Sequence, residues 1–361
     1  MNLPIPNTAG SAKGGTPAPP PSVVDPALVA EMLFNTMVIY GPTGSRKTSQ
    51  IGEFAKYIYE KTGKVTRLVS CDGGGWAPIQ DLINAGIIEA WRLVDEPKLL
   101  AAIMAASRGA WPKLHKNGMR IPGPITVPSQ ADKTKALKDV GAYAIEGWAS
   151  IASAMMRYVV EDGRKINEDV VSKFTEDSDF GNFSFGAPSR GHYNFAQAQI
   201  LDIIKNYSGL PVERILYTSL EGKGEDKLTK QLQYGPMVAG SAITAAIPQY
   251  VGDCLHFEDY MVETGSDPAN PTQKLKELRV RAWFQQHPDV QTSVMWPAKC
   301  RLVPNKVQAF KDIMGKQGYF DLENKSLRDY LLAQDEMLSS SSNEAREWKA
   351  RIDASRSQTA Q

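Results

Sequence analysis

The sequence has few of the residues that staple or metallate small proteins, with three cysteines and four histidines among 361 residues. The cysteines are Cys71, Cys254 and Cys300. They are far apart, odd in number and without C-x-x-C spacing, which argues against a disulfide framework or a zinc site and favours a reducing compartment. The histidines are His115, His192, His256 and His287. They show no metal-ligand spacing, so we expect structural or surface roles for them.

A strong net charge and long apolar runs are missing as well. The net charge is +1, so no global field draws the chain to nucleic acid or to a membrane, and any such contact must be local. No apolar run reaches the length of a bilayer span, and the N-terminus lacks the charged-then-apolar order of a signal peptide. With 42% hydrophobic and 22% charged residues, the composition predicts a soluble, cytoplasmic, globular protein with no membrane partner.

The two ends of the chain differ in composition from its middle. Gly, Pro and small residues dominate "NTAGSAKGGTPAPPPS", which predicts a disordered arm over residues 1–25. The polar end "SSSSNEAREWKARIDASRSQTAQ" predicts a flexible tail over residues 339–361. Between them we expect one domain over residues 26–303, with insertions at about 104–139 and 161–192, and then C-terminal helices over residues 304–338.

Strand-like and helix-like segments alternate along this domain. Short apolar runs predict strands at 36–41, 65–72, 140–147 and 214–221. Helical periodicity predicts helices at 48–60, closed by Gly63, and at 148–160 and 193–209. The alternation predicts an α/β fold with a mainly parallel sheet. After residue 250, "DCLHFEDYMV", "LRVRAWFQQ" and "AKCRLV" predict an antiparallel extension, and "NKVQAFKDIMGKQG" and "SLRDYLLAQDEM" predict two small helices.

The segment "GPTGSRKTSQ", residues 41–50, has the pattern of a phosphate-binding loop between a strand and a helix. Successive backbone N–H groups in such a turn form an anion-binding nest, and the helix N-terminus adds partial positive charge. Lys47 is placed to reach the β- and γ-phosphates, and the Thr48 hydroxyl is placed to ligate Mg²⁺. We therefore expect ATP and Mg²⁺ as cofactors. The predicted nucleotide-binding residues are Gly41, Pro42, Thr43, Gly44, Ser45, Arg46, Lys47, Thr48 and Ser49.

Arg46 departs from the pattern, because a glycine is expected directly before the lysine. Glycine there lets the backbone approach the phosphates without interference from a side chain. In the first helical turn a larger residue can adopt the required dihedral angles, and its guanidinium can point outward or add positive charge. Two adjacent cations at a helix N-terminus are unfavourable unless an anion is present, which favours a nucleotide site over an ordinary strand–turn–helix connection.

Several segments follow one another in an order known from one family: "VIYGPTGSRKTSQ", "RLVSCDGGG", "AYAIEG", and "ILYTSLEGKGE" followed by "YGPMVAGSAITAAIPQYVGDCLHFE". In this the chain resembles the bacteriophage-type RecA-like P-loop ATPases, which are linked to recombination and single-strand DNA annealing. The resemblance covers roughly residues 34–303. It implies a RecA-like P-loop core, a homo-oligomeric ring or filament, single-stranded DNA as a partner and, for a phage-encoded chain, the host cytoplasm as the location.

The resemblance also implies roles for two carboxylates. Asp72 ends "VTRLVSCD", where the family has the base that orients the attacking water, although the glycines after it also fit a simple turn. Glu146 ends "AYAI", where the family has a Walker B carboxylate, usually Asp, that holds Mg²⁺ through water; an exposed strand-end carboxylate is the alternative. Asp72, Glu146 and Lys47 are the predicted catalytic residues, and Thr48 and Glu146 the predicted metal residues. The implied sensor strand carries Thr218, Ser219 and Glu221.

Two segments correspond to the DNA-contacting loops of RecA-like proteins. The first, about residues 161–190, has aromatic residues that can stack on bases or, equally, pin the loop to the core. The second, "EGKGEDKLTKQLQYGP", carries lysines that can contact phosphates, although nearby acidic residues bring its net charge close to zero. The candidate nucleic-acid contacts are Lys223, Lys227, Lys230 and Arg190. The candidate arginine fingers for a neighbouring subunit are Arg279, Arg281 and Arg301.

Together these patterns predict an ATP-binding and ATP-hydrolysing phage protein of DNA recombination or replication that binds or anneals single-stranded DNA. The alternative is a nucleotide-binding assembly or structural subunit of a phage complex, in which Arg46 and Glu146 reflect relaxed catalytic demands. A small-molecule kinase is less well supported, since the sequence shows no substrate lid or acceptor motif.

Overall fold

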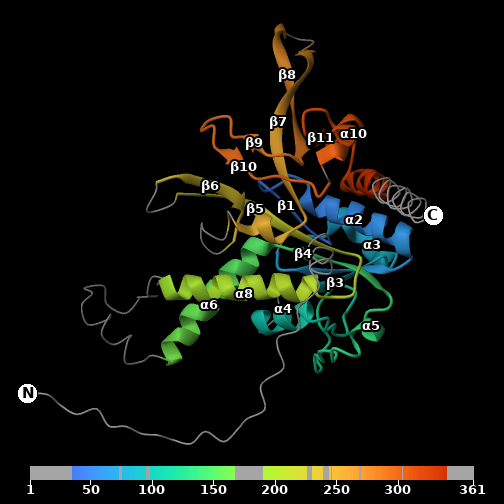
Figure 1. Cartoon of the computed structure of the whole chain (residues 1–361), viewed down its shortest axis with the longest axis vertical. Helices are drawn as coiled ribbons and strands as arrows, with labels where there is room; N and C mark the ends of the chain where they lie inside the picture. Colours follow the sequence, from blue (N-terminus) through green and yellow to red (C-terminus); the bar gives the residue numbers. More distant parts are fainter. Residues whose placement is uncertain are drawn as a thin grey trace, which may run out of the picture.

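The computed structural model describes residues 35–72, 75–94, 98–166, 190–225, 230–238, 244, 246–267, 270–302 and 304–339. Within them, a nine-stranded sheet has the order β11-β8-β7-β1-β5-β4-β2-β3, with β6 paired to β5 (Figure 1). Along the sheet order, β3, β2, β4, β5, β1 and β7 run parallel to one another. β8 is antiparallel to β7, and β11 is antiparallel to β8. The α/β class is therefore confirmed: a mainly parallel sheet with an antiparallel extension and small C-terminal helices, as the RecA-like resemblance predicted.

The strands are β1 (Thr36–Gly41), β2 (Val65–Ser70), β3 (Ile88–Arg92), β4 (Val140–Glu146), β5 (Arg214–Glu225), β6 (Leu232–Pro236), β7 (Asp253–Asp267), β8 (Asn270–Trp283), β9 (His287–Pro288), β10 (Met295–Trp296) and β11 (Tyr319–Asp321). The α-helices are α2 (Lys47–Thr62), α3 (Gln80–Asn84), α4 (Leu99–Ser107), α5 (Lys133–Ala136), α6 (Trp148–Ile166), α8 (Arg190–Ser208) and α10 (Pro304–Met314), and a last helix covers residues 327–339. Short 3₁₀ turns lie at Ala77–Ile79 and Ile247–Tyr250.

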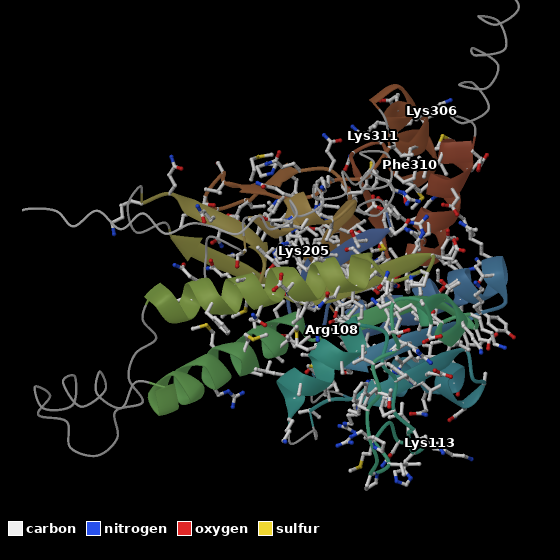
Figure 2. All side chains as sticks on the ribbon, turned by 60° about the horizontal axis from the view of Figure 1, so that its bottom comes forward. Arg108, Lys113, Lys205, Lys306, Phe310 and Lys311 are labelled. Atoms are coloured by element: carbon white, nitrogen blue, oxygen red, sulfur yellow. The ribbon has the colours of Figure 1, made fainter. Side chains whose placement is uncertain are left out.

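The sheet buries both of its faces, and alternate residues of β1 show this directly. Val38 and Tyr40 join a core that includes residues of α4, α6 and α8, whereas Met37 and Ile39 join a second core with α2 and the C-terminal helices. Phe310 of α10 is fully buried in this second core (Figure 2). A strand covered on both faces reads as a continuous apolar run, which is why "TMVIYG" was recognisable as a strand.

One predicted strand was wrong, and several short strands were not predicted. The strands β3 and β11 were not predicted, because each is short and lies among turn residues. Conversely, the described residues of "AKCRLV", 298–302, form only an isolated bridge between Lys299 and Cys254. Tertiary pairing decides such short segments more than their own sequence does.

The C-terminal segment packs directly on α2, the helix that follows the phosphate-binding loop. Leu327 donates its backbone N–H to Gln50 Oε1 at 2.7 Å, and Arg328 Nε donates to Glu60 Oε2 at 2.8 Å. Leu327 and Tyr330 are fully buried in the same core as the α2 side chains. One face of α2 therefore rests on the sheet and another on the end of the chain.

Two hairpins extend the sheet. β5 continues past the parallel core and pairs antiparallel with β6, from Glu221 opposite Pro236 to Glu225 opposite Leu232. β7 and β8 form a longer ribbon that projects from the body of the molecule at the top of Figure 1. The segment predicted as a second DNA-contacting loop is thus largely a β-hairpin, because its alternating side chains extend the pairing of β5.

Candidate functional site

The loop 41–46 joins β1 to α2 at the carboxyl edge of the parallel strands. Gly41 is required there, because a Cβ at this position would lie 2.4 Å from the Phe257 carbonyl oxygen of the neighbouring strand β7. Gly44 has a φ of 87°, in the left-handed region that glycine adopts without cost. The N-terminus of α2 has no side-chain cap and no acidic residue in its first turn. The helix therefore supplies no capping side chain of its own for its first amides.

Arg46 is the N-cap of α2, with φ 62° and ψ 19° in the left-handed region. The expectation that it lies in the first helical turn was wrong, because the helix begins at Lys47. A non-glycine residue in this conformation costs roughly 1–2 kcal/mol, so the loop keeps the backbone shape that glycine would take and bears the strain. The guanidinium points outward, as predicted for one of its two orientations, and forms an ion pair with Glu323.

Lys47 folds back over the loop. Its Nζ donates to the carbonyl oxygens of Gly41, at 2.9 Å, and Pro42, at 2.6 Å, and to Ser45 Oγ, at 3.1 Å. Ser45 is itself buried and donates to the Pro42 carbonyl at 2.8 Å. The ammonium thus has three neutral acceptors, all of them groups of the loop that it would leave or share when an anion arrives.

The electrostatic surroundings of Lys47 are acidic. Burial lowers the pKa of Lys47 to about 8, from an ordinary 10.5, and four carboxylates oppose this shift: Asp259, Glu221, Asp72 and Glu146. Burial also raises the pKa of Asp259, and its Oδ1 is buried with no hydrogen-bond partner among the described residues. Such a ring of carboxylates would repel a free triphosphate, so it suits an anion that arrives with a divalent cation.

The two predicted metal residues meet. Thr48 Oγ1 donates to Glu146 Oε1 at 2.6 Å, and Ser70 Oγ donates to Glu146 Oε2 at 2.7 Å. Glu146 is 5% exposed, so the alternative of an exposed strand-end carboxylate is wrong. One hydroxyl and one carboxylate match what Mg²⁺ takes from proteins when phosphates and waters supply its other ligands. In the described part of the chain, no cluster of three or more His, Cys, Asp or Glu side chains forms another metal site.

Asp72 lies two residues after the end of β2, beside the end of β4. Cys71 donates its backbone N–H to the Glu146 carbonyl at 3.0 Å, which brings the two strand ends together. Gly147 has a φ of 81°, and a Cβ there would lie 2.9 Å from the backbone nitrogen of Asp72. The side chain of Asp72 is exposed. Its position near Lys47 is compatible with the predicted base, and that role stays a prediction.

β5 is the strand that the resemblance makes a sensor strand, and most of its polar residues at that point are engaged within the protein. Thr218 is buried, and Ser219 Oγ donates to the Met237 carbonyl at 2.8 Å. Glu221 Oε2 lies 3.2 Å from Nε2 of His256, a histidine to which the sequence assigned no more than a structural or surface role. The sequence offered no signal for this pair, because it depends on how β7 lies beside β1.

The candidate nucleic-acid contacts have different outcomes. Lys223 lies within β5, 3.9 Å from Asp289 and over the rings of Tyr234 and Trp296, but its side chain is 53% exposed, so its contact with nucleic acid stays a prediction. Lys230 lies just before β6 and is exposed, while Lys227 falls outside the described residues. Arg190 begins α8. The predicted aromatic loop falls mainly outside the described residues, since 167–189 are not among them.

The candidate arginine fingers are all engaged within the chain. Arg301 is 8% exposed at its side chain and pairs with Asp335, so it is not available to a neighbouring subunit. Arg281 Nε donates to Glu258 at 2.7 Å, and its guanidinium lies over three aromatic rings. Arg279 pairs with Glu277 two residues away, on the projecting ribbon, and is the most accessible of the three.

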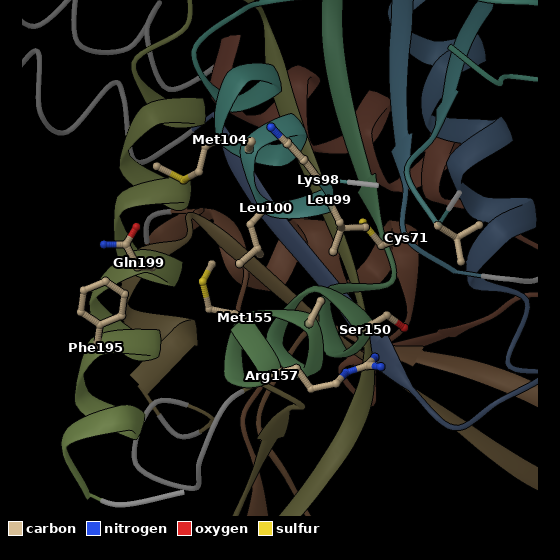
Figure 3. A pocket seen from close by; sticks show the side chains of 13 residues that line it. Cys71, Lys98, Leu99, Leu100, Met104, Ser150, Met155, Arg157, Phe195 and Gln199 are labelled. Atoms are coloured by element: carbon tan, nitrogen blue, oxygen red, sulfur yellow. The ribbon is translucent and has the colours of Figure 1, made fainter. Parts of the chain in front are cut away.

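A cavity of about 1040 Å³ lies among α4, α6 and α8 (Figure 3). Leu100, Met104, Met155 and Phe195 line it, with Cys71 among them. Burial raises the pKa of the Cys71 thiol, which keeps it protonated and unreactive. The cavity is therefore no thiolate site.

Comparisons with known proteins find matches only among solved structures. No family profile matches the sequence, and no curated protein matches it. Among solved structures, a RadB recombinase matches 72% of this chain and 84% of its own, with 8% identity and a TM-score of 0.35. A KaiC-like protein from the hyperthermophilic archaeon Pyrococcus horikoshii matches 80% of this chain and 88% of its own, with 10% identity and a TM-score of 0.32. Likenesses this distant carry no argument about activity, so the function is argued from the site.

Proposed function

We propose that the chain is a RecA-like ATPase that binds ATP with Mg²⁺ at residues 41–49 and hydrolyses it. One arrangement carries the proposal: an uncapped helix start, with Lys47 folded into the loop and Thr48 hydrogen-bonded to the buried Glu146. An ordinary strand–turn–helix connection has no use for two cations at the helix N-terminus or for a buried carboxylate beside it.

Each residue of the site has a task in this proposal. The loop amides and Lys47 bind the β- and γ-phosphates, and Lys47 exchanges its neutral carbonyl partners for anionic oxygens. Thr48 and Glu146 are the residues that would hold Mg²⁺, and Ser70 keeps Glu146 in place. The ion would supply positive charge that neutralises the phosphates. Asp72 orients the attacking water as the general base.

The finer part of the proposal concerns partners. We propose a phage protein of DNA recombination or replication, acting in the host cytoplasm as a homo-oligomeric ring or filament on single-stranded DNA. The order of its sequence motifs supports this, and exposed Lys230 adds a cation at the edge of the β5–β6 hairpin. In the described residues, no helix is long and apolar enough to span a membrane.

The test is a titration of MgATP by calorimetry, with an ATPase assay with and without single-stranded DNA. Lys47→Ala should abolish binding. Lys56→Ala changes a partly exposed lysine of the same helix that pairs with Glu53, and it should leave binding unchanged. Stimulation of turnover by the oligonucleotide supports the recombination role.

Two other results would change the proposal. Binding without turnover, and without an oligonucleotide shift at low salt, would favour the assembly or structural subunit. No binding by the folded wild-type protein would refute the nucleotide site and everything built on it.

A further inference from the structure

A series of three polar contacts runs from Glu221 in β5 to the β9–β10 hairpin. Glu221 Oε2 lies 3.2 Å from His256 Nε2, and His256 Nδ1 lies 2.8 Å from His287 Nε2. His287 Nδ1 lies 3.3 Å from the Pro288 carbonyl oxygen. Both rings are buried, with 1% and 3% of their surface exposed. Two buried imidazoles in series are costly unless their hydrogen bonds are satisfied.

The Glu221 end of this series of contacts lies beside the phosphate-binding loop. His256 of β7 is the register partner of Tyr40, which directly precedes Gly41, and the two rings stack at 4.7 Å. Glu221 follows Leu220, the register partner of Gly41 in β5. Glu221 therefore stands at the carboxyl edge of the sheet, next to the strand that carries the loop.

Aromatic packing fixes the plane of both rings. His256 packs against Tyr40 and Trp296, with ring centroids 4.2 Å apart and an interplanar angle of 13° to Trp296. His287 stacks on Trp283 at 4.0 Å and 13°. These stacks fix the ring planes, and the polar partners of the nitrogens decide between the two flipped orientations of each ring.

Counting protons limits the states of this series of contacts. An ionised carboxylate and a backbone carbonyl only accept, so three links need three N–H protons, whereas two neutral imidazoles supply two. One link must therefore lack a proton, or the series must take up a third. A bare ring nitrogen facing a carboxylate is worse than one facing a neutral carbonyl, because the carboxylate is charged. With two protons, His256 donates from Nε2 to Glu221 and His287 donates from Nε2 to His256 Nδ1. The His287 Nδ1 then carries no proton, and its contact with the Pro288 carbonyl is no hydrogen bond.

Burial keeps both rings neutral near pH 7. Burial lowers the pKa of His256, against the opposing effects of Glu221 and Glu258, while Lys223 adds to the lowering. Burial, followed by the charge of His256, lowers the pKa of His287 to about 4; there Glu258 opposes the shift and Arg281 adds to it.

We propose that His256 is a positioning residue that holds Glu221 toward the γ-phosphate end of the nucleotide, and that His287 holds His256 in the tautomer with hydrogen on Nε2. The proposal rests on the proposed ATPase function. In it, His256 does not touch nucleotide; it restricts the Glu221 carboxylate to one orientation, from which Glu221 accepts a hydrogen bond from the attacking water and so helps to orient the water that Asp72 deprotonates. Removing His256 should lower turnover and leave nucleotide affinity alone.

The test compares two variants that differ in which link they keep. Gln in place of His256 sets an amide nitrogen near Nε2 and still donates to Glu221, whereas Asn sets its amide near Nδ1 and loses Glu221. Both lose the ring stack, so stability changes are matched. We expect His256→Asn to lower kcat by about 10- to 100-fold with an unchanged Kd for MgATP, and His256→Gln to recover most of it. His115→Asn, at an exposed histidine, is the control that should match the wild type.

Two further measurements separate positioning from simple support of the fold. In a Glu221→Gln background, His256→Asn should cause no additional loss of kcat, because the residue acts through Glu221. The ¹⁵N shifts of the imidazoles should show His256 protonated at Nε2 before and after addition of a non-hydrolysable MgATP analogue.

Failure of this inference differs from failure of the function beneath it. A wild-type protein that neither binds nor hydrolyses ATP refutes the ATPase proposal. If the wild type turns over and His256→Asn matches it, or if both variants lose the same activity, only the positioning role is refuted. Hydrogen on Nδ1 of His256 rather than Nε2 would also overturn it, with or without turnover.

Discussion

Asp335 offers a sharp test of how the site's helix is supported. Its Oδ1 accepts from Arg214 Nη2 at 2.6 Å and its Oδ2 from Lys61 Nζ at 2.6 Å, and Tyr57 donates its hydroxyl to the same carboxylate. Arg301 lies at 3.3 Å. The carboxylate thus joins α2, β5 and the last helix at one point.

Asp335→Asn keeps the shape of the side chain and removes its charge. The side chains of Arg214 and Arg301 are only 5% and 8% exposed, so the buried Arg214 charge loses its carboxylate partner, while Arg301 keeps its pair with Asp253. Breaking a buried ion pair costs about 3–5 kcal/mol; because Asp335 is itself 25% exposed, we expect a loss near the lower limit, about 3 kcal/mol at pH 7. Urea unfolding followed by circular dichroism measures it.

The dependence on pH tests the same reasoning. Burial pushes the pKa of Asp335 up, but the Arg214 charge and the hydrogen bonds from Lys61 and Tyr57 outweigh it and leave the pKa below its ordinary value. A carboxyl with a lowered folded pKa stabilises fully above its unfolded pKa of about 3.9, and this stability is lost as pH falls through the folded pKa. The difference in free energy of unfolding between the wild type and Asp335→Asn should therefore have its full size at pH 7 and shrink below about pH 4.

Asp202 provides the matched control, since it is a largely exposed Asp of α8 whose lysine contact measures 3.9 Å. Asp202→Asn should change stability by less than about 0.5 kcal/mol. A loss that small for Asp335→Asn, or a difference that does not change between pH 7 and pH 3.5, would refute the reasoning.

Three further predictions concern the loop and the metal residues. Arg46→Gly removes the left-handed strain and Arg46→Ala keeps it, while both lose the pair with Glu323; urea unfolding should show glycine more stable by about 1 kcal/mol, and equal stabilities would contradict the strain. Glu146→Gln should lower the affinity for Mg²⁺ by about 10–100-fold, measured by a metal titration of nucleotide binding. An unchanged affinity would show that Glu146 is not part of the metal site. Gly41→Ala forces a methyl group against Phe257 and should destabilise by at least about 1–3 kcal/mol in thermal melting; a neutral result would mean that β1 and β7 part easily.

Much of the nucleotide site could be predicted from the sequence because it is local or lies at strand ends. The loop, the α2 face and Gly63 as its C-cap follow from short-range pattern, and Gly63 does donate its N–H to the Tyr59 carbonyl at 2.8 Å. Thr48 was expected to bind Mg²⁺ from the loop pattern and Glu146 from the resemblance, and the structure brings the two side chains together because parallel strands and the helices after them meet at one edge of the sheet.

The rest depends on contacts between distant segments. The left-handed φ of Arg46 is set by the closure of the loop, which no residue preference announces. The pairing of Glu221 with His256, 35 residues apart, needs the register of β7 on β1. The β5–β6 hairpin was mistaken for a loop because its glycines and charges resemble turn residues, whereas pairing with a neighbouring strand decides such segments.

The docking of the chain's end on α2 has a consequence for how the molecule can be altered. Glu323 holds the residue in front of the lysine, Leu327 holds Gln50, and Asp335 holds the far end of the helix. A ligand or subunit that displaces this segment from α2 would expose buried apolar side chains. The same displacement would remove the contacts that support the phosphate-binding loop. Deleting residues from the carboxyl side of the protein should therefore abolish nucleotide binding at the loop, although the deletion lies far from the loop in the sequence.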